Sequence, residues 1–386
     1  MQQAQRLADF PPYVFAAIGR RIARMRCEGI DVIRLDIGNP DLPPAPFIVE
    51  KLYEAVRQPD THGYGGYFGQ PALRQAMATY YQRRFDVALD PDTQVLPLIG
   101  SKEGIFNLAL AFVNPGDVVL VPDPGYPTYA GGARVVGGEV VTMPLLAESD
   151  FMPDLDAIPA EVAGRAKLLW LNYPNNPTGG VASLEFFKKA VAFAATHNIL
   201  LCHDAPYVEL TYDGYRAPSL LQVPGARQVV IEFNSLSKSY NMAGWRVGMA
   251  VGNQDAVAAL GKLKSNIDSG LFLAVQAAAA AALTGDQSWL AERNAIYRQR
   301  RDIVLEGLTA AGFKARTPQA TIYVWAQVPD GFTSAEFAER LLSEQAVSVS
   351  PGNAFGVHGE GYVRISLARA TERIQEAMAR LQRLRY

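Results

Sequence analysis

Short apolar runs recur through the middle of the chain, and most are followed by glycine, proline, asparagine or aspartate. The runs show little alternation of polar and apolar residues, which is typical of parallel strands that helices cover on both faces. Helical patterns separate the runs, so the chain predicts an α/β fold with a mostly parallel sheet. We expect strands at 33–38, 95–99, 118–121, 167–171, 199–202, 229–233 and 247–251, and helices at 14–29, 46–57, 103–112 and 184–196.

A different pattern begins near residue 289. A long amphipathic segment at about 289–311 predicts a helix that ends at Gly312. Beyond it, 320–325 and 362–367 have the composition of strands, and polar residues alternate with apolar ones in the second. We therefore expect a smaller α+β domain, to which we add the N-terminal segment. The predicted division is 1–45 and 289–386 for the small domain and 46–288 for the large domain.

The composition, with 49% hydrophobic and 19% charged residues in 386, is that of an ordinary globular protein. A net charge of −2 predicts no nucleic-acid partner, because such partners need a basic surface. The alanine-rich stretch at 274–283 is too short to span a membrane, and the N-terminus lacks the pattern of a signal peptide. Cys27 and Cys202 lie far apart and in no metal-binding spacing, so we expect reduced thiols in a cytoplasmic protein.

Two common kinds of catalytic site find no support in the sequence. The histidines show no metal-ligand spacing, so no metal site is predicted. No G-x-S-x-G motif occurs, so a serine hydrolase is not expected either.

The segment from Ser235 to Gly248 carries the strongest chemical signal. Lys238 lies between two predicted strands among small and polar residues, which suits a lysine that forms a Schiff base with a carbonyl group. A solvated loop lysine is the alternative. Ser235 and Arg246 flank Lys238, and both suit a phosphate group. The segment resembles the lysine segment S-x-S-K…G-x-R-x-G of class I aminotransferases, which use pyridoxal phosphate.

Polar residues at the carboxyl ends of neighbouring strands meet at one edge of an open α/β sheet. Asp204 ends an apolar run and needs a partner there, and the pyridinium nitrogen of pyridoxal phosphate is a fitting one. The alternative is an N-cap for a following turn. Tyr207 and Asn176 are placed to reach the ring hydroxyl. Tyr126 follows a Pro-Gly pair, where it either stacks on the ring or is an ordinary loop aromatic.

The stretch Gly100-Ser101-Lys102 opens a predicted helix, whose free N–H groups favour a phosphate. The stretch lacks the spacing of a Walker A loop. Together with Ser235 and Arg246 it predicts a phosphate site of one guanidinium, two hydroxyls and helix amides.

The order of these segments resembles that of the class I and II aminotransferases of the aspartate aminotransferase superfamily over nearly the whole chain. The resemblance implies fold type I, in which a large domain with a mostly parallel, seven-stranded sheet joins a smaller α+β domain. It also implies pyridoxal phosphate as the cofactor and Lys238 as the lysine that holds it. The implied contacts are Ser101, Lys102, Ser235 and Arg246 at the phosphate, and Asp204, Tyr207 and Asn176 at the ring.

The resemblance also bears on the substrate and on a partner. Arg364 lies in an alternating strand, where it is either a surface ion-pair residue or a bidentate clamp for a carboxylate. The resemblance implies the clamp, acting on the substrate α-carboxylate, with Gly38, Asn176 and Tyr13 in the same substrate site. In this family the tyrosine that matches Tyr64 reaches the phosphate of the partner subunit, which implies a homodimer.

Three activities are open at this stage. The first is transfer of an amino group from an α-amino acid to 2-oxoglutarate or pyruvate. The second is a C–S β-lyase reaction at the same cofactor site, and a requirement for a 2-oxo acid separates the two. The third, a non-catalytic protein of the same fold, is disfavoured because every chemical residue is present.

The sequence also leaves open which amino acid donates the amino group. The segments Gly100-Ser101-Lys102-Glu103-Gly104 and Tyr323-Val324-Trp325 resemble LL-diaminopimelate aminotransferases and their relatives. Plant-type members carry a glutamate in the loop after the tyrosine that matches Tyr64, whereas residues 65–69 include no acid here. Lys102 offers a positive charge for a distal carboxylate. This loop therefore favours an acidic or neutral donor, while the wider resemblance points to diaminopimelate.

Overall fold

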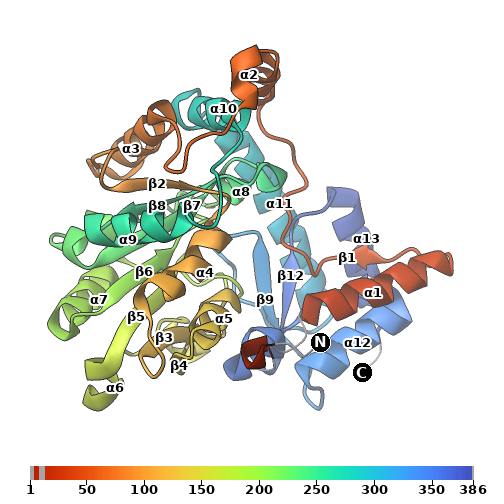
Figure 1. Cartoon of the computed structure of the whole chain (residues 1–386). Coiled ribbons are helices and arrows are strands. Elements are labelled where there is room, and N and C mark those ends of the chain that lie inside the picture. Colours follow the sequence, from red (N-terminus) through yellow and green to blue (C-terminus); the bar gives the residue numbers. More distant parts are fainter. Residues whose placement is uncertain (1–3, 8–13, 385–386) are drawn as a thin grey trace.

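The computed structural model describes residues 4–7 and 14–384, and Figure 1 shows a large body beside a smaller one. Within these residues, seven strands form the central sheet of the large body in the order β2-β8-β7-β6-β5-β3-β4. Only β8 runs antiparallel to its neighbours in this sheet, so the predicted α/β class with a mostly parallel sheet is confirmed. The strands are β2 (Val95–Leu98), β3 (Val118–Asp123), β4 (Glu139–Pro144), β5 (Ala166–Asn172), β6 (Leu200–Asp204), β7 (Val230–Ser235) and β8 (Gly248–Gly252).

Helices cover both faces of this sheet. In β5, Leu168 and Trp170 pack in one core, and Leu169 and Leu171 pack in the other, as expected where successive side chains point to opposite faces. The first face packs against α4 (Ser101–Phe112), α5 (Thr128–Val135) and α9 (Gln254–Lys264). The second packs against α2 (Pro46–Val56), α3 (Pro71–Phe85), α7 (Leu184–His197) and α10 (Leu273–Thr284). The short helices α6 (Ala160–Arg165) and α8 (Leu236–Ser239) lie in the connections.

The smaller body has its own apolar core, built largely from β9, β12, α11, α12 and α13. Its antiparallel sheet has the order β11-β12-β9, and β1 pairs with β10 in parallel. The strands are β1 (Ile33–Arg34), β9 (Tyr323–Gln327), β10 (Val347–Ser348), β11 (Ser350–Pro351) and β12 (Tyr362–Ser366). The helices are α1 (Val14–Cys27), α11 (Trp289–Ala310), α12 (Ser334–Gln345) and α13 (Thr371–Leu381).

The pairing of β1 with β10 places the N-terminal segment on the C-terminal part of the chain. The long helix α11 joins the two bodies, because Trp289 packs at the large core and Val304 and Leu308 pack in the small one (Figure 1). The boundaries at 45/46 and 288/289 stay a prediction.

Two predicted strands differ from the observed ones near the junction of the bodies. The strand expected at 33–38 ends at Arg34, and the following residues turn toward the junction, where the carbonyl oxygen of Asp36 accepts a hydrogen bond from Arg364. The strand expected at 320–325 begins only at Tyr323, because Thr321 has a left-handed backbone with φ of 73°. Both differences arise from contacts between segments far apart in the sequence.

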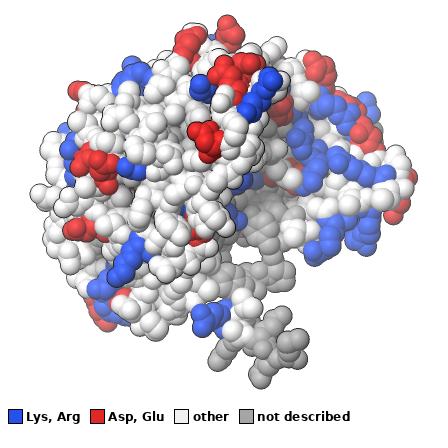
Figure 2. Space-filling model, turned by 45° about the horizontal axis from the view of Figure 1, so that its top comes forward, with Lys and Arg blue, Asp and Glu red and all other residues white. Residues whose placement is uncertain are grey.

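Charged residues of both signs are interspersed over the face shown in Figure 2. Lys and Arg are denser on its right-hand side, where Figure 1 places α1, a helix that contains Arg20, Arg21, Arg24 and Arg26. Among the described residues, no helix is both long enough and apolar enough to cross a membrane.

Candidate active site

A cavity of about 570 Å³ lies at the carboxyl ends of β5, β6 and β7, where the small sheet faces the large one. This is the edge at which open α/β sheets bind their ligands. The cavity brings together most of the residues predicted from the sequence. They are Gly38, Ser101, Lys102, Tyr126, Asn176, Asp204, Tyr207, Ser235, Lys238, Arg246 and Arg364.

Asp204, the last residue of β6, is buried at the floor of the cavity. Its Oδ2 accepts a hydrogen bond of 2.7 Å from Tyr129 on α5. Its Oδ1 has no hydrogen-bond partner among the described residues. Burial raises the pKa of Asp204 to about 6, although the bond from Tyr129 and the charge of His203 oppose the shift. A buried carboxylate with one free oxygen is suited to a cationic ring nitrogen.

The turn after β5 fixes Asn176 beside this carboxylate. The Asn172 amide nitrogen donates to the carbonyl oxygen of Asp204 at 2.6 Å, and its amide oxygen accepts from the backbone N–H of Asn176 at 2.8 Å. Asn175 closes the turn through Thr178. The side-chain oxygen of Asn176 accepts from Arg364 at 2.7 Å, so its amide nitrogen is the atom that can donate to a ligand.

Lys238 lies on the short helix α8, which follows β7 directly. Ser235 caps this helix, because its Oγ accepts from the backbone N–H of Ser237 at 3.2 Å. Burial lowers the pKa of Lys238, and the charges of Arg364 and Arg246 add to the effect. Its ammonium group contacts the carbonyl oxygen of Gly38 across the cavity. A lowered pKa increases the fraction of neutral, nucleophilic amine at a given pH.

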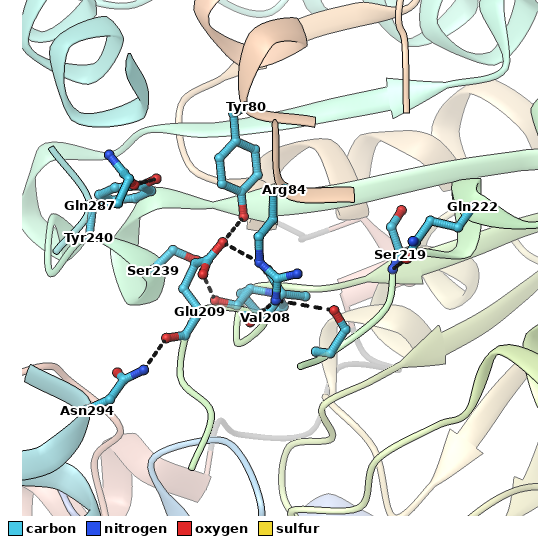
Figure 3. Close-up of polar contacts among 12 residues, drawn as sticks. Tyr80, Arg84, Val208, Glu209, Ser219, Gln222, Ser239, Tyr240, Gln287 and Asn294 are labelled. Atoms are coloured by element: carbon cyan, nitrogen blue, oxygen red, sulfur yellow. Dashed lines mark hydrogen bonds and ion pairs between the residues drawn. The ribbon is translucent and has the colours of Figure 1, made fainter. Parts of the chain in front are cut away.

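A buried polar network supports the turn of Lys238 from behind. Arg293, on the first turns of α11, donates to the carbonyl oxygens of Ser239 and Glu209. Figure 3 shows the Glu209 carboxylate between Tyr80 and Arg84, to which it is bonded at 2.6 and 3.1 Å. The network thus ties α8 to α3 and α11, and it anchors the backbone that carries Lys238.

On the opposite wall, Ser101 and Lys102 occupy the first turn of α4, which starts two residues earlier than predicted. Arg246 approaches this turn so closely that a Cβ on Gly100, whose φ is 75°, would overlap its guanidinium. The ammonium of Lys102 lies 5.8 Å from the ring centre of Tyr126. The wall therefore combines helix N–H groups, one hydroxyl and two cations, which is a chemistry suited to phosphate.

Arg364 on β12 is buried between two aromatic rings. The centre of its guanidinium lies 4.2 Å from the ring centre of Tyr323 and 4.6 Å from that of Phe355. Its Nη2 donates to the carbonyl oxygen of Asp36 at 2.8 Å. The stacking holds the guanidinium flat and fixes the direction of its N–H groups.

Among the described residues, one predicted site residue is not part of this cavity. Tyr64 has 88% of its surface exposed and does not line it. Tyr13 lies outside the described residues.

Other residues of the site were missed from the sequence. Tyr129 and Phe355 are aromatic residues whose role depends on long-range packing, and no local motif marks them. Tyr323 belongs to a segment that carries the family resemblance, but no role in the site was predicted for it. Asn172 offered a signal, because it is a polar residue at the end of a buried apolar strand.

The cavity fits the predicted cofactor. The free Oδ1 of Asp204 matches a pyridinium nitrogen, and Lys238 matches the aldehyde. The wall of Ser101 and Arg246 matches the phosphate. Among the described residues, no group of three or more His, Cys, Asp or Glu side chains is placed to hold a metal ion.

Comparison with known proteins agrees with this chemistry. The family model for aminotransferase class I and II matches residues 30–381. An LL-diaminopimelate aminotransferase of Moorella thermoacetica is 54% identical over 384 residues, covering 100% of this chain and 98% of the relative. Another, of Dehalococcoides mccartyi, is 51% identical over 381 residues, covering 99% and 98%. Among solved structures, substrate-bound BacF of Bacillus subtilis superposes with a TM-score of 0.96 at 39% identity, covering 99% of this chain and 97% of BacF.

Proposed function

Since the chain belongs to the class I and II aminotransferases, we propose that it exchanges an amino group between LL-diaminopimelate and 2-oxoglutarate. The chain is a pyridoxal-phosphate-dependent aminotransferase that acts on an α-amino acid and a 2-oxo acid. The observation that carries the choice of LL-diaminopimelate is the identity of 51–54% with aminotransferases named for this substrate, over almost the whole of both chains. The same relatives favour amino-group transfer over the C–S β-lyase reaction.

The charge of the cavity supports dicarboxylic substrates. Four cations line it, of which Lys238 and Arg246 are assigned to the cofactor, so Arg364 and Lys102 are left to face the two carboxylates of a substrate. LL-diaminopimelate and 2-oxoglutarate each carry two carboxylates. We assign the α-carboxylate to Arg364, with Asn176 and the backbone of Gly38 beside it, and the distal carboxylate to Lys102.

The loop at residues 65–69 bears on one contact only, the one to a distal ammonium group. Because the loop has no acidic residue, it favours an acidic or neutral amino-group donor. The identity with LL-diaminopimelate aminotransferases over almost the whole chain outweighs this single contact. Tyr13 is retained as a proposed substrate contact.

The proposed roles at the cofactor follow from the side chains that line the cavity. When bound, pyridoxal phosphate supplies an electron sink for negative charge at the substrate α-carbon. Lys238 holds the cofactor and, as a neutral amine, moves the α-proton. Asp204 holds the pyridine nitrogen through Oδ1, and Tyr207 and Asn176 hold the ring hydroxyl. Tyr126 stacks on the ring.

Residues from two walls of the cavity bind the phosphate of the cofactor. The guanidinium of Arg246 and the hydroxyls of Ser101 and Ser235 bind it, and Lys102 adds charge. The helix N-terminus of α4 contributes its N–H groups.

We further propose a homodimer in which Tyr64 reaches the partner's site. Tyr64, Tyr67 and Phe68 have 88%, 51% and 50% of their surfaces exposed. Ile267 and Phe272 are exposed on the neighbouring loop, and a Cβ on Gly270 would overlap the carbonyl oxygen of Gly66. A contiguous group of exposed large apolar side chains favours burial against a second molecule.

A cytoplasmic location completes the proposal. It rests on the two cysteines, Cys27 and Cys202, which are both free thiols.

The test is an assay of the purified enzyme, loaded with pyridoxal phosphate, with LL-diaminopimelate and 2-oxoglutarate. We expect glutamate to form only when both are present. Aspartate, alanine and meso-diaminopimelate serve as competing donors, and pyruvate as a competing acceptor. Glutamate from another donor but none from LL-diaminopimelate would overturn the substrate. Pyruvate from cystathionine without any 2-oxo acid would instead establish the lyase reaction.

A further inference from the structure

Tyr323, the first residue of β9, occupies a central place in the cavity, although neither its sequence context nor the proposed contacts give it a role. Its side chain is 3% exposed and lines the cavity. Its ring lies under the guanidinium of Arg364, with 4.2 Å from ring centre to guanidinium carbon. Its hydroxyl lies 3.1 Å from the hydroxyl of Tyr207. One side chain thus touches both the proposed carboxylate clamp and the proposed ring contact.

The two contacts come from different bodies of the molecule. Arg364 and Tyr323 lie on the neighbouring strands β12 and β9, where Tyr323 is opposite Ser366 and Arg364 is opposite Trp325. This register puts both side chains on the same face, in diagonal contact. Tyr207, by contrast, follows β6 of the large sheet. Tyr323 therefore bridges the small sheet and the large one.

We propose that Tyr323 is a positioning residue that couples the substrate clamp to the cofactor ring, by supporting the Arg364 guanidinium with its ring and orienting the Tyr207 hydroxyl with its own. The proposal rests on the proposed roles of Arg364 and Tyr207. The space around Tyr323 agrees with it, because a Cβ on Gly38 would overlap the Tyr323 hydroxyl. The glycine leaves room for that hydroxyl to reach Tyr207.

The number of available protons fixes the direction of the hydrogen bond between Tyr323 and Tyr207. Each hydroxyl has one proton, and Tyr207 needs its own to donate to the ring oxygen of the cofactor. Tyr323 must then donate to Tyr207. The charged surroundings favour this direction: burial raises the pKa of Tyr323, but the positive charges of Arg364 and Lys238 act against burial, and the pKa of Tyr323 is lowered. Burial raises the pKa of Tyr207. The more acidic hydroxyl is the better donor.

If Tyr323 only filled space, replacing it with phenylalanine would have no effect, because phenylalanine fills nearly the same space. Tyr323→Phe keeps the ring under Arg364 and removes only the hydrogen bond to Tyr207. Tyr362→Phe is the matched control: it removes a tyrosine hydroxyl from the same sheet, one that accepts from Gln327 and lies outside the cavity.

The first readout needs no substrate. The visible absorption band of the cofactor bound to Lys238 is titrated with pH in the parent, Tyr323→Phe and Tyr362→Phe. Without the donor from Tyr323, Tyr207 stabilises the anionic ring oxygen less, so we expect the midpoint of Tyr323→Phe to move upward by about half a pH unit. Tyr362→Phe keeps the parent midpoint. The groups that face Tyr323 and contribute to its environment are Arg364, Lys238 and Tyr207.

The second readout is kinetic. For whichever amino acid the enzyme accepts, Tyr323→Phe lowers kcat about fivefold and leaves KM within about twofold, because the stacking on Arg364 remains. Tyr323→Leu also removes the ring and raises KM about tenfold. A Tyr323→Phe enzyme with the parent's midpoint and the parent's kcat would overturn the proposal. Failure of LL-diaminopimelate as a substrate would leave the absorption midpoints unaffected, so the two failures are distinguishable.

Discussion

Tyr129 and Asp204 form a buried pair in which the tyrosine hydroxyl, on α5, donates at 2.7 Å to Oδ2 of a carboxylate at the end of β6. The ring of Tyr129 stacks on Trp170, with ring centres 4.8 Å apart, so the hydroxyl is held in place. One oxygen of Asp204 is thereby satisfied from behind, and the other is left for the cavity.

This pair predicts the effect of Tyr129→Phe. Loss of a hydrogen bond to a buried carboxylate costs about 1.5–3 kcal/mol, so ionised Asp204 becomes harder to maintain. We expect kcat to fall at least tenfold and the affinity for pyridoxal phosphate to weaken. Tyr173→Phe is the matched control, because Tyr173 is also buried but donates to the backbone oxygen of Phe151. Equal kinetics in the two variants would show that Tyr129 only fills space.

The raised pKa of Asp204 predicts how the stability of the cofactor-free protein depends on pH. Its folded-state pKa of about 6 lies above the unfolded value of about 3.9, so the folded chain binds the proton more tightly. Proton binding by Asp204 contributes fully to the free energy of unfolding below pH 4, and this contribution is lost as the pH rises through 6. The charged carboxylate then costs the cofactor-free protein about 3 kcal/mol.

Asp204→Asn removes that cost. In the cofactor-free form we expect a higher Tm than the parent's at pH 8, and an advantage that shrinks as the pH falls through 6. Added pyridoxal phosphate should stabilise the parent more than the variant. Asp86→Asn, at an exposed helix end, is the control for the loss of a surface carboxylate. A cofactor-free Asp204→Asn protein that is less stable than the parent at pH 8 contradicts this account.

Gly100→Ala tests the phosphate wall. The new Cβ would overlap the guanidinium of Arg246, and the backbone of Gly100, with φ of 75° and ψ of 148°, adds a strain of about 1–3 kcal/mol for any other residue. We expect the affinity for pyridoxal phosphate, measured by equilibrium dialysis, to fall at least tenfold. Gly116→Ala separates strain from overlap, because Gly116 has a φ of 85° but no atom lies within 4 Å of its added Cβ. If both variants bind the cofactor alike, the approach of Arg246 to Gly100 is irrelevant to binding.

The proposed sharing of sites between subunits predicts complementation. Lys238→Ala and Tyr64→Ala should each be inactive, whereas a hybrid dimer has one site in which both residues are native. An equimolar mixture, unfolded and refolded together, should recover about a quarter of the parent activity. Mixing Lys238→Ala with Asp204→Ala should recover none, since these residues share one pocket within a chain. Recovery in neither mixture, or in both, would contradict the assignment of Tyr64.

The sequence predicted those parts of the site that follow from strand ends and local motifs. Asp204 and Ser235 are the last residues of the neighbouring parallel strands β6 and β7, so the topology of the sheet alone brings them together. Lys238 and Arg246 belong to one short segment. These residues were predictable because their positions depend on local sequence and on sheet order.

The contacts that the sequence did not predict are those between distant segments. Tyr129 meets Asp204 across 75 residues, and Asn176 meets Arg364 across 188. Tyr323 and Phe355 enclose Arg364 only because two strands and a loop of the small body converge. An aromatic residue in an apolar run is usually a core residue, and its polar contact becomes visible only in three dimensions.

The most direct test of the account is the site of borohydride reduction in the purified, cofactor-loaded enzyme. After reduction and proteolysis, mass spectrometry should find the cofactor on the peptide that contains Lys238, and prior addition of LL-diaminopimelate should remove most of this label, because the substrate amine displaces the lysine. Attachment to another lysine of the site, such as Lys102, or a label on Lys238 that LL-diaminopimelate leaves unchanged, would contradict the account.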